Sequence, residues 1–321
     1  MLHTDIEPTT RNGRTAVNTP STIADQVGNT PLIRLKRTAE RAGLPETVEL
    51  YAKAEWFNPS GSVKDRPALS IIRAAERDGR LRPGMTLLDS TSGNMGIAYA
   101  MLGAARGYKV KLALPANASP ERIAILKAYG AELILTDPLE GSDGAILEAR
   151  RIAAEDPSIF YANQYSNPAN WQAHYQGTAV EIWDQTFGRV THFTTGLGTS
   201  GTFVGTSRRL KEYNQEIVCI SSQPDSPFNG LEGWKHMPTA ITPAIYDETI
   251  ADGNIDIRTE DAYVMARDLA RYEGLFVGIS AAGSIVGMLQ VARQLDEGVV
   301  VTVLPDNGFK YLSERFWDEN K

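Results

Sequence analysis

The apolar positions of the chain follow two alternating patterns. In one, apolar residues recur every three or four positions, which is typical of amphipathic helices. In the other, short runs of mostly apolar residues stand between turns, which is typical of buried strands. The helix pattern covers residues 65–78, 96–107, 120–129, 144–155, 177–186, 202–213, 260–272 and 281–295. The strand pattern covers residues 48–54, 86–89, 110–114, 132–135, 159–162, 192–195, 217–221 and 299–303, with a further short strand inside 23–35.

Strand and helix patterns alternate along most of the chain, and this order predicts an α/β fold. Parallel strands need crossover connections, so the alternation favours parallel sheets. More than eight crossovers would strain one open sheet, and we therefore expect two parallel-sheet α/β lobes with a cleft between them. A polar loop is predicted at 163–172, and residues 1–20 are predicted to form a flexible tail.

Composition narrows the class of protein. The chain has 321 residues, of which 42% are hydrophobic and 22% charged, as in an ordinary soluble globular protein. A net charge of -7 argues against nucleic acid as a partner, because a phosphate backbone demands a basic face. The single cysteine, Cys219, lies in an apolar run and speaks against a disulfide framework or a zinc cluster. No apolar stretch is long enough to cross a bilayer, and the N-terminal segment does not resemble a signal peptide, so we expect a cytoplasmic protein with no membrane partner.

One lysine occupies a chemically unusual position. A Pro-Ser-Gly-Ser turn at 59–62 leads to Lys64, where a helix is predicted to begin. The positive end of a helix disfavours a cation and lowers the pKa of a lysine placed there. A neutral amine is what a Schiff-base nucleophile requires. Lys64 is therefore a candidate catalytic residue, with a solvated first-turn lysine as the alternative.

A glycine-bearing turn, STSGNMG at 90–96, lies between a predicted strand and a predicted helix. Gly93 permits close backbone approach, and the amides that open the helix suit a carboxylate. Thr91, Ser92 and Asn94 add hydroxyl and amide donors. A strand-to-helix cap without a ligand would also explain this turn.

A second turn, GLGTSGT at 196–202, satisfies the G-x-G-x-x-G fingerprint of dinucleotide-binding proteins. It lies in mid-chain, and its hydroxyl side chains suit a terminal phosphate better than a pyrophosphate. We therefore favour a phosphate monoester, with a nicotinamide-dependent oxidoreductase as the alternative from a different class. A third turn, FVGISAAGS at 276–284, places Ser280 where it is predicted to cap a helix, which structure alone would explain.

Six ordered segments together resemble a known family. NPSGSVKDRPA, TSGNMG, NQYSNPAN, GLGTSGT, GIS and PDNGFKYLS are similar in order and spacing to the cysteine synthase (O-acetylserine sulfhydrylase) family of fold-type II pyridoxal-phosphate enzymes. The likeness covers about residues 20–315, and QPDSPFNGLEGWKHMPTAITPAIYD is more similar to the B-type isozyme than to the A-type. The resemblance implies a tryptophan synthase β-like architecture and a homodimer. It also implies a smaller mobile domain at 55–165 and a larger cofactor-binding domain made of 21–54 and 166–321.

The same resemblance implies a site for pyridoxal 5'-phosphate. Lys64 would bond to the cofactor as an internal aldimine and take the proton from the substrate. Asn94 would hydrogen-bond the ring hydroxyl, and Ser280 would meet the pyridine nitrogen. The 5'-phosphate would be held by Gly198, Thr199, Ser200, Gly201 and Thr202. The substrate carboxylate would face Thr91, Ser92, Gly93, Met95 and Gln164.

The implied reaction is a β-replacement. A neutral serine opposite the ring nitrogen does not hold that nitrogen protonated, which favours prompt loss of a β-leaving group over a long-lived carbanion. The resulting aminoacrylate would add sulfide or another sulfur donor, so that O-acetyl-L-serine or a similarly activated serine becomes L-cysteine. The alternatives are a β-synthase that uses O-phosphoserine, homocysteine or ammonia, a serine or threonine dehydratase, and a cofactor-binding regulator without turnover.

Two departures and one loop bear on substrate choice. Met95 stands where the family usually has threonine, so one hydroxyl near the carboxylate is lost. Residues 281–283 are Ala-Ala-Gly in place of the usual serine-glycine-alanine. Lys235 and His236 follow a glycine-bearing turn at 230–233, and there they would attract an anionic donor or acceptor such as thiosulfate or O-phosphoserine. The alternative is a solvated lysine and an ordinary surface histidine on a mobile loop.

Overall fold

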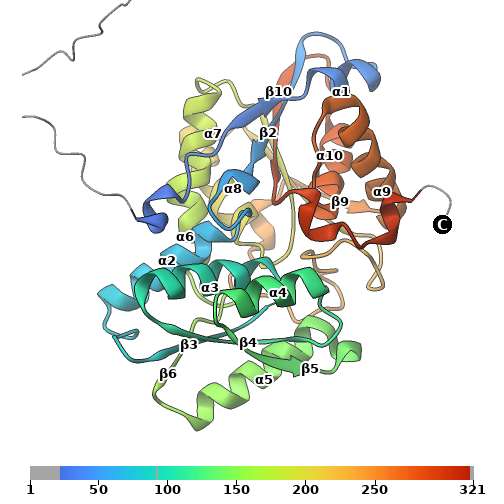
Figure 1. The fold of residues 1–321 in the computed structure, drawn as a ribbon. Coiled ribbons are helices and arrows are strands. Elements are labelled where there is room, and N and C mark those ends of the chain that lie inside the picture. The colour runs from blue at the N-terminus through green and yellow to red at the C-terminus, as the bar shows by residue number, and fades with distance from the viewer. Residues whose placement is uncertain (1–21, 92, 319–321) are drawn as a thin grey trace, which may run out of the picture.

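The computed structural model describes residues 22–91 and 93–318, so the predicted tail at 1–20 and the candidate Ser92 lie outside the described residues. The described chain forms two sheets in two α/β lobes (Figure 1). The six-stranded sheet has the order β1-β2-β10-β7-β8-β9, and the four-stranded sheet has the order β5-β4-β3-β6. The strands are β1 (Leu32–Arg34), β2 (Val48–Ala54), β3 (Thr86–Ser90), β4 (Lys109–Pro115), β5 (Glu132–Thr136), β6 (Ile159–Tyr161), β7 (His192–Gly196), β8 (Val218–Pro224), β9 (Gly253–Ile257) and β10 (Gly298–Leu304).

Helices cover both sheets. In the smaller lobe α5 lies on one face of the four-stranded sheet, and α3 and α4 lie on the other (Figure 1). Two π-helical turns, His174–Thr178 and Leu269–Glu273, continue α6 and α9. The α-helices are α1 (Lys36–Arg41), α2 (Asp65–Arg77), α3 (Asn94–Arg106), α4 (Pro120–Ala128), α5 (Gly141–Glu155), α6 (Ala169–Ala173), α7 (Ala179–Gln185), α8 (Gly201–Tyr213), α9 (Thr259–Asp268) and α10 (Ile279–Ala292).

The strand pairing confirms the predicted parallel sheets. Every pair is parallel except β1 with β2, which is antiparallel at the edge of the larger sheet. The last strand, β10, lies between β2 and β7. Because parallel strands end at one edge, the turns that follow β2, β7 and β10 lie together, and this edge is where α/β proteins bind ligands.

Most apolar segments of the sequence are buried in the core. All residues of α10 except Gln290 are buried, because this helix packs between the larger sheet and α9. In the smaller lobe Ile71 and Ile72 of α2 pack in one apolar cluster with Leu87 of β3 and Leu112 of β4. Each such fully buried aliphatic side chain contributes about 1.5–3 kcal/mol relative to an exposed one.

Helix ends follow the local signals. Ser119 Oγ accepts a hydrogen bond from Arg122 N (3.4 Å) at the start of α4, and Gly107 ends α3 with φ 76°.

Three elements were not predicted: α1, α6 and β9. Both helices are short and begin without a side-chain cap. β9 is an edge strand that begins at Gly253 and has only one fully buried residue, Ile257. The predicted polar loop at 163–172 is therefore wrong in its last residues, which form α6.

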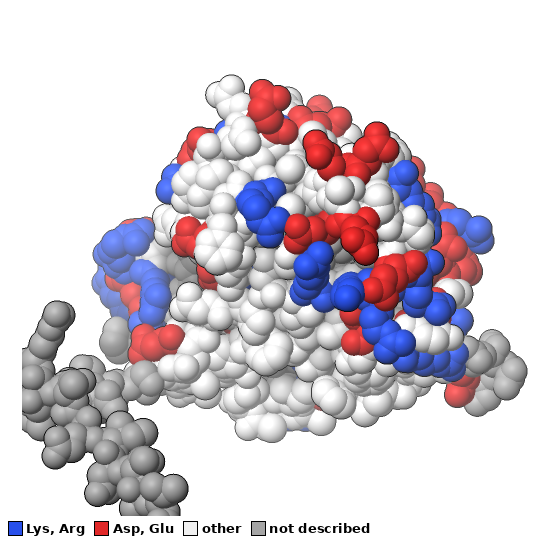
Figure 2. Space-filling view, turned by 90° about the horizontal axis from the view of Figure 1, so that it is seen from above, with Lys and Arg blue, Asp and Glu red and all other residues white. Residues whose placement is uncertain are grey.

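Charge is mixed on the surface. On the face shown in Figure 2, acidic and basic side chains lie beside one another, and its described residues form no broad basic area. Within 22–91 and 93–318, no helix has the length and apolarity needed to cross a bilayer. The same residues contain no group of His, Cys, Asp or Glu side chains suited to a metal ion.

Candidate active site

Lys64 occupies the N-cap position of α2, so the predicted helix start is correct to within one residue. The turn before it is tied to the end of β10, because Val63 N donates to Pro305 O (2.8 Å) and Ser62 bridges to Asp306. The lysine side chain is half-buried and lines the cleft between the lobes. Its place is therefore fixed by the segment that follows β10 as well as by the helix.

Burial lowers the pKa of Lys64 to about 8. The charge of Asp306 acts in the opposite direction, since a carboxylate favours the ammonium form. The direction agrees with the prediction from sequence, but the leading cause differs: desolvation and not the helix dipole. A pKa near 8 leaves an appreciable fraction of free amine at neutral pH, as a nucleophile requires.

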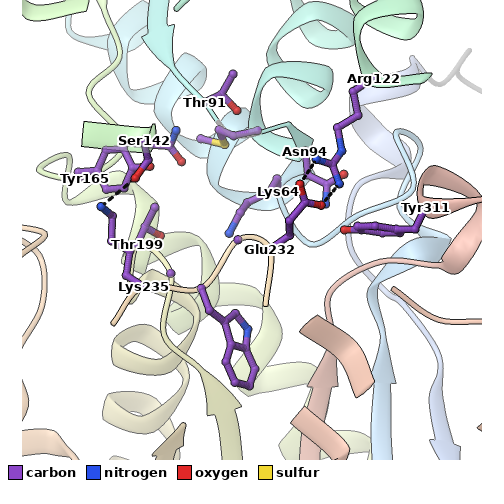
Figure 3. A pocket seen from close by; sticks show the side chains of 15 residues that line it. Lys64, Thr91, Asn94, Arg122, Ser142, Tyr165, Thr199, Glu232, Lys235 and Tyr311 are labelled. Atoms are coloured by element: carbon purple, nitrogen blue, oxygen red, sulfur yellow. Dashed lines mark hydrogen bonds and ion pairs between the residues drawn. The ribbon is translucent and has the colours of Figure 1, made fainter. Parts of the chain in front are cut away.

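The cleft around Lys64 has a cavity volume of about 160 Å³ (Figure 3). Its lining includes Thr91, Asn94, Met95, Gln164, Gly198, Thr199 and Lys235, all of them predicted site residues. Ser200, Thr202 and Ser280 line its inner part. Gly93 and Gly201 belong to the same turns without lining the cleft themselves. The structure thus brings the described candidates together.

The turn after β7 forms a backbone cradle at the N-terminus of α8. A Cβ added to Gly198 would lie 2.2 Å from Gly233 O, and one added to Gly201 would lie 2.0 Å from Asn170 Oδ1. Ser200 adopts φ 67°, which is rare for a residue other than glycine, and among the described residues its buried Oγ has no hydrogen-bond partner. A strained serine with an unsatisfied hydroxyl at a helix N-terminus fits an anionic group such as a phosphate monoester.

Two side chains that the sequence did not assign support this cradle. Asn170 Nδ2 donates to Thr199 Oγ1 (3.1 Å) and to Gln164 O (2.8 Å), so it joins the cradle to the substrate side of the cleft. His174 Nε2 lies 3.3 Å from Thr202 Oγ1. Burial holds the pKa of His174 well below its ordinary value, so the ring is neutral. Asn170 stands within the segment NQYSNPAN, which carried the family resemblance but gave this residue no role.

The turn after β3 is shaped by Thr91. Its Oγ1 accepts hydrogen bonds from Gly93 N and Gly96 N, both at 3.0 Å. Gly93 has φ 150°, and a Cβ there would lie 2.7 Å from Arg122 Cδ, so a side chain at this position would collide. Met95 is buried at 2% exposure and closes one wall. The threonine thus positions the backbone amides and keeps its own O–H for a ligand.

Gln164 joins this turn to the chain after β6. Its Nε2 donates to Ser90 O (2.5 Å), and its backbone N donates to Asp89 Oδ2 (3.2 Å). Burial raises the pKa of the Asp89 carboxyl to about 7. One N–H of the Gln164 amide is left for a ligand.

Lys235 is buried, with 6% exposure, so the alternative of a solvated loop lysine is wrong. Its Nζ pairs with Asp143 Oδ1 (2.8 Å). It also donates to Ser142 Oγ (3.2 Å) at the start of α5 (Figure 3). His236 does not line the cleft and instead lies 2.8 Å from Thr239 Oγ1 through Nδ1. The cation that faces the cleft from this loop is therefore Lys235, and its charge is balanced by Asp143.

The helix start at Ser280 differs from the prediction. Ser280 is the second residue of α10, and Gly278 holds the N-cap position, so the predicted capping role is wrong. Ile279 opens the helix because an apolar residue there is buried against the core. Ser280 is itself buried and lines the inner cleft beside Lys64.

The Ala-Ala-Gly departure has a structural counterpart in Trp234. A Cβ added to Gly283 would lie 3.1 Å from Trp234 Cη2, and one added to Gly196 would lie 1.8 Å from Trp234 Cε2. Both glycines therefore make room for the indole. The tryptophan seats the loop that carries Glu232 and Lys235 against the larger lobe.

Several lining residues were missed from the sequence: Arg122, Ser142, Tyr165, Glu232, Gly233 and Tyr311. Of these, four lie in segments that carried the family resemblance: Tyr165 in NQYSNPAN, Glu232 and Gly233 in the B-type segment at 223–247, and Tyr311 in PDNGFKYLS. Arg122 and Ser142 stand in helices without a local signal, and they reach the cleft through contacts between distant parts of the chain.

Comparison with known proteins shows the family to which the chain belongs. The family of pyridoxal-phosphate dependent enzymes matches residues 23–306, and the chain belongs to it. A cysteine synthase of Aquifex aeolicus is 52% identical, over 93% of this chain and 92% of that protein. Cysteine synthase B of Escherichia coli is 42% identical, over 93% and 97%.

Solved structures of related enzymes have a similar fold over most of the chain. A cysteine synthase of Entamoeba histolytica has a TM-score of 0.87 and 37% identity, and the match covers 98% of this chain and 94% of the other. An O-ureido-L-serine synthase has a TM-score of 0.87 and 36% identity, over 94% and 96%. These comparisons confirm the predicted fold class and the predicted cofactor, pyridoxal phosphate.

Proposed function

We propose that this enzyme makes L-cysteine by β-replacement, from O-acetyl-L-serine or a similarly activated serine and sulfide or another sulfur donor. The observation that carries the proposal is the half-buried Lys64, with its pKa near 8, in one cleft with the phosphate-sized cradle at 198–202. Relatives at 42–52% identity are named cysteine synthases, which supports the same reaction.

The residues present fit pyridoxal phosphate. Lys64 would hold it covalently, and the cradle of Gly198, Thr199, Ser200, Gly201 and Thr202 would hold its phosphate through backbone amides and hydroxyls. Asn94 and Ser280 would contact the ring from opposite lobes. When bound, the cofactor supplies an electron sink for the bond that breaks at the substrate Cα.

The chain's own groups would bind the substrate and move its proton. The backbone amides that open α3 at Asn94 and Met95, the Thr91 hydroxyl and the remaining N–H of the Gln164 amide would bind the carboxylate. Lys64 Nζ would take the proton from the substrate Cα, because a neutral amine in a desolvated position is an effective base. Ser280, a hydroxyl and not a carboxylate, would leave the ring nitrogen without a stabilising negative charge.

We also propose that residues 55–165 form a domain that moves relative to 21–54 and 166–321. Two ion pairs across the cleft, Arg122 with Glu232 and Lys235 with Asp143, would form when the lobes approach. A homodimer remains our proposal for the assembly, and a part of the face in Figure 2 with few charged side chains is the kind of surface that a second copy would cover.

The identity of the nucleophile is tested by comparing candidate nucleophiles in parallel assays. Purified holoenzyme is supplied with O-acetylserine and, in parallel, with sulfide, thiosulfate, homocysteine or ammonia, and each product is quantified. The proposal expects the highest kcat/KM with a sulfur donor that yields cysteine. A preference for homocysteine or ammonia would replace cysteine synthesis by another β-synthase reaction. Pyruvate as the main product would indicate a dehydratase.

A further inference from the structure

Asp306 is a fully buried carboxylate that the roles above do not use. It follows β10, and its backbone O accepts from Gly278 N (3.2 Å). Its Oδ2 accepts from Asn94 Nδ2 (2.6 Å) and from Tyr311 O–H (2.7 Å). A buried carboxylate costs free energy unless it is paired, so a position like this one calls for a specific partner.

The other end of the Asn94 amide faces a second buried charge. Lys310 Nζ donates to Asn94 Oδ1 (2.8 Å) and also to Ser60 O (3.1 Å), in the turn that leads to Lys64. Lys310 is only 8% exposed. Asn94 therefore lies between an ammonium and a carboxylate, both held by the larger lobe.

This arrangement allows one orientation of the amide. An ammonium can only donate hydrogen bonds, and an ionised carboxylate can only accept them. If the Asn94 amide rotated by half a turn, its NH2 group would meet the Lys310 ammonium and its oxygen would meet the Asp306 carboxylate. Both hydrogen bonds would be lost, and each is of the stronger, charge-assisted kind.

In the observed orientation the amide has one N–H left. The Asn94 Nδ2 has two hydrogens, of which one is bound to Asp306. Asn94 and Lys64 line the same inner cleft, together with Ser200 and Ser280. The remaining N–H is therefore the group that Asn94 can offer to a ligand there.

We propose that Asp306 and Lys310 are positioning residues that fix the Asn94 amide, so that its free N–H serves an acceptor oxygen on the ring of the bound cofactor. This inference rests on the proposed function, because it takes the cleft to be the cofactor site. The charged or titratable groups that face Asp306 are Tyr311 in contact and Lys310, Lys64 and Arg122 at longer range. Of the two groups in contact with the amide, Asp306 fixes its nitrogen end and Lys310 fixes its oxygen end.

The test is a double-mutant cycle on cofactor affinity. The Kd for pyridoxal phosphate is measured by titrating cofactor-free protein, for the unmodified chain, Asp306→Asn, Asn94→Ala and the double variant. Asp306→Asn is expected to raise the Kd about tenfold, because the charge-assisted hydrogen bond at the nitrogen end of the amide is lost and Lys310 alone then holds its orientation. In the Asn94→Ala background the same change is expected to alter the Kd less than twofold, because no amide is left to orient. The absorption maximum of the bound cofactor should shift alike in Asp306→Asn and Asn94→Ala.

Controls keep the outcomes distinct. Asp252→Asn makes the same chemical change in a lysine-paired carboxylate outside the cleft, and it should leave the Kd and the absorption maximum unchanged. If Asp306→Asn does not fold, Lys310→Met enters the same cycle. Equal effects in both backgrounds, or an unchanged Kd, would overturn the positioning role while leaving the proposed function intact. If the unmodified chain binds no pyridoxal phosphate, the proposed function itself falls, and this inference with it.

Discussion

The Arg122 guanidinium and the Glu232 carboxylate form an ion pair across the mouth of the cleft, with Nη1 2.7 Å from Oε1 (Figure 3). Arg122 belongs to α4 beside the four-stranded sheet, and Glu232 belongs to the loop that follows β8. The guanidinium also lies 5.0 Å from the centre of the Tyr311 ring. The pair therefore links the two lobes at the cleft that Lys64 lines.

We predict that Glu232→Gln raises the KM for the amino-acid substrate two- to fivefold with little change in kcat. The carboxylate is 42% exposed, so the pair contributes only about 0.5–1 kcal/mol to closure of the lobes. Steady-state kinetics checks this, with Glu260→Gln as a control in an exposed pair with Arg258. A large loss of kcat would instead place Glu232 in the chemistry.

Ser200→Gly should separate stability from cofactor binding. Glycine adopts φ 67° without strain, and the change removes a buried hydroxyl that has no partner among the described residues. We expect the cofactor-free protein to gain about 1 kcal/mol of unfolding free energy and the Kd for pyridoxal phosphate to rise. Chemical denaturation and titration measure the two quantities. A Kd equal to that of the unmodified chain would show that this hydroxyl does not hold the phosphate.

The pKa of Lys64 predicts how cofactor capture depends on pH. Only the free amine can bond to the cofactor, so the rate of capture by cofactor-free protein should rise with pH and level off above about 8. Stability should change with pH in the same direction. The folded-state pKa of Lys64 is below the unfolded value, so the buried ammonium destabilises the folded protein, and this destabilisation decreases as pH rises above about 8. Stopped-flow absorbance checks the first statement. A rate that does not change between pH 6 and about 9 would contradict it.

Lys235 should affect anionic substrates most. We expect Lys235→Ala to raise the KM for thiosulfate or O-phosphoserine about fivefold, with a smaller effect on sulfide with O-acetylserine. Asp143→Asn removes the partner that now balances this charge, so it should lower the KM for the same anions. Equal effects of both variants on every substrate pair would exclude a role for this loop in substrate choice.

The fold was largely predictable because its signals are local. Runs of apolar residues bounded by glycine or polar turns predicted every strand except β9, and the spacing of the three glycine-bearing turns predicted where ligand groups gather. α1 and α6 are too short to show a periodic pattern, and they form because the rest of the lobe packs around them. The predicted capping role of Ser280 was wrong because α10 begins one residue earlier, at Ile279. Ile279 is buried in the core, and the sequence does not show this burial.

The missed parts of the site depend on contacts across the chain. Asp306 and Asn94 are 212 positions apart, and Arg122 and Glu232 are 110 apart, so neither pair leaves a local pattern. The same is true of Lys235, because the carboxylate that balances its charge, Asp143, is 92 positions away in the sequence. The sequence singled out Lys235 for an anionic substrate but gave Asp306, Arg122 and Glu232 no role, because these pairings are a property of the assembled lobes.

The most direct test of the account is the rate of L-cysteine formation from O-acetylserine and sulfide by Lys64→Ala, measured with excess pyridoxal phosphate and compared with the unmodified enzyme. The account predicts that the unmodified enzyme forms cysteine and that the variant, although folded, loses activity by a factor of about 1,000 or more, because it lacks both the covalent attachment and the base. Cysteine formation by the variant within tenfold of the unmodified rate, or none by either protein, would contradict it.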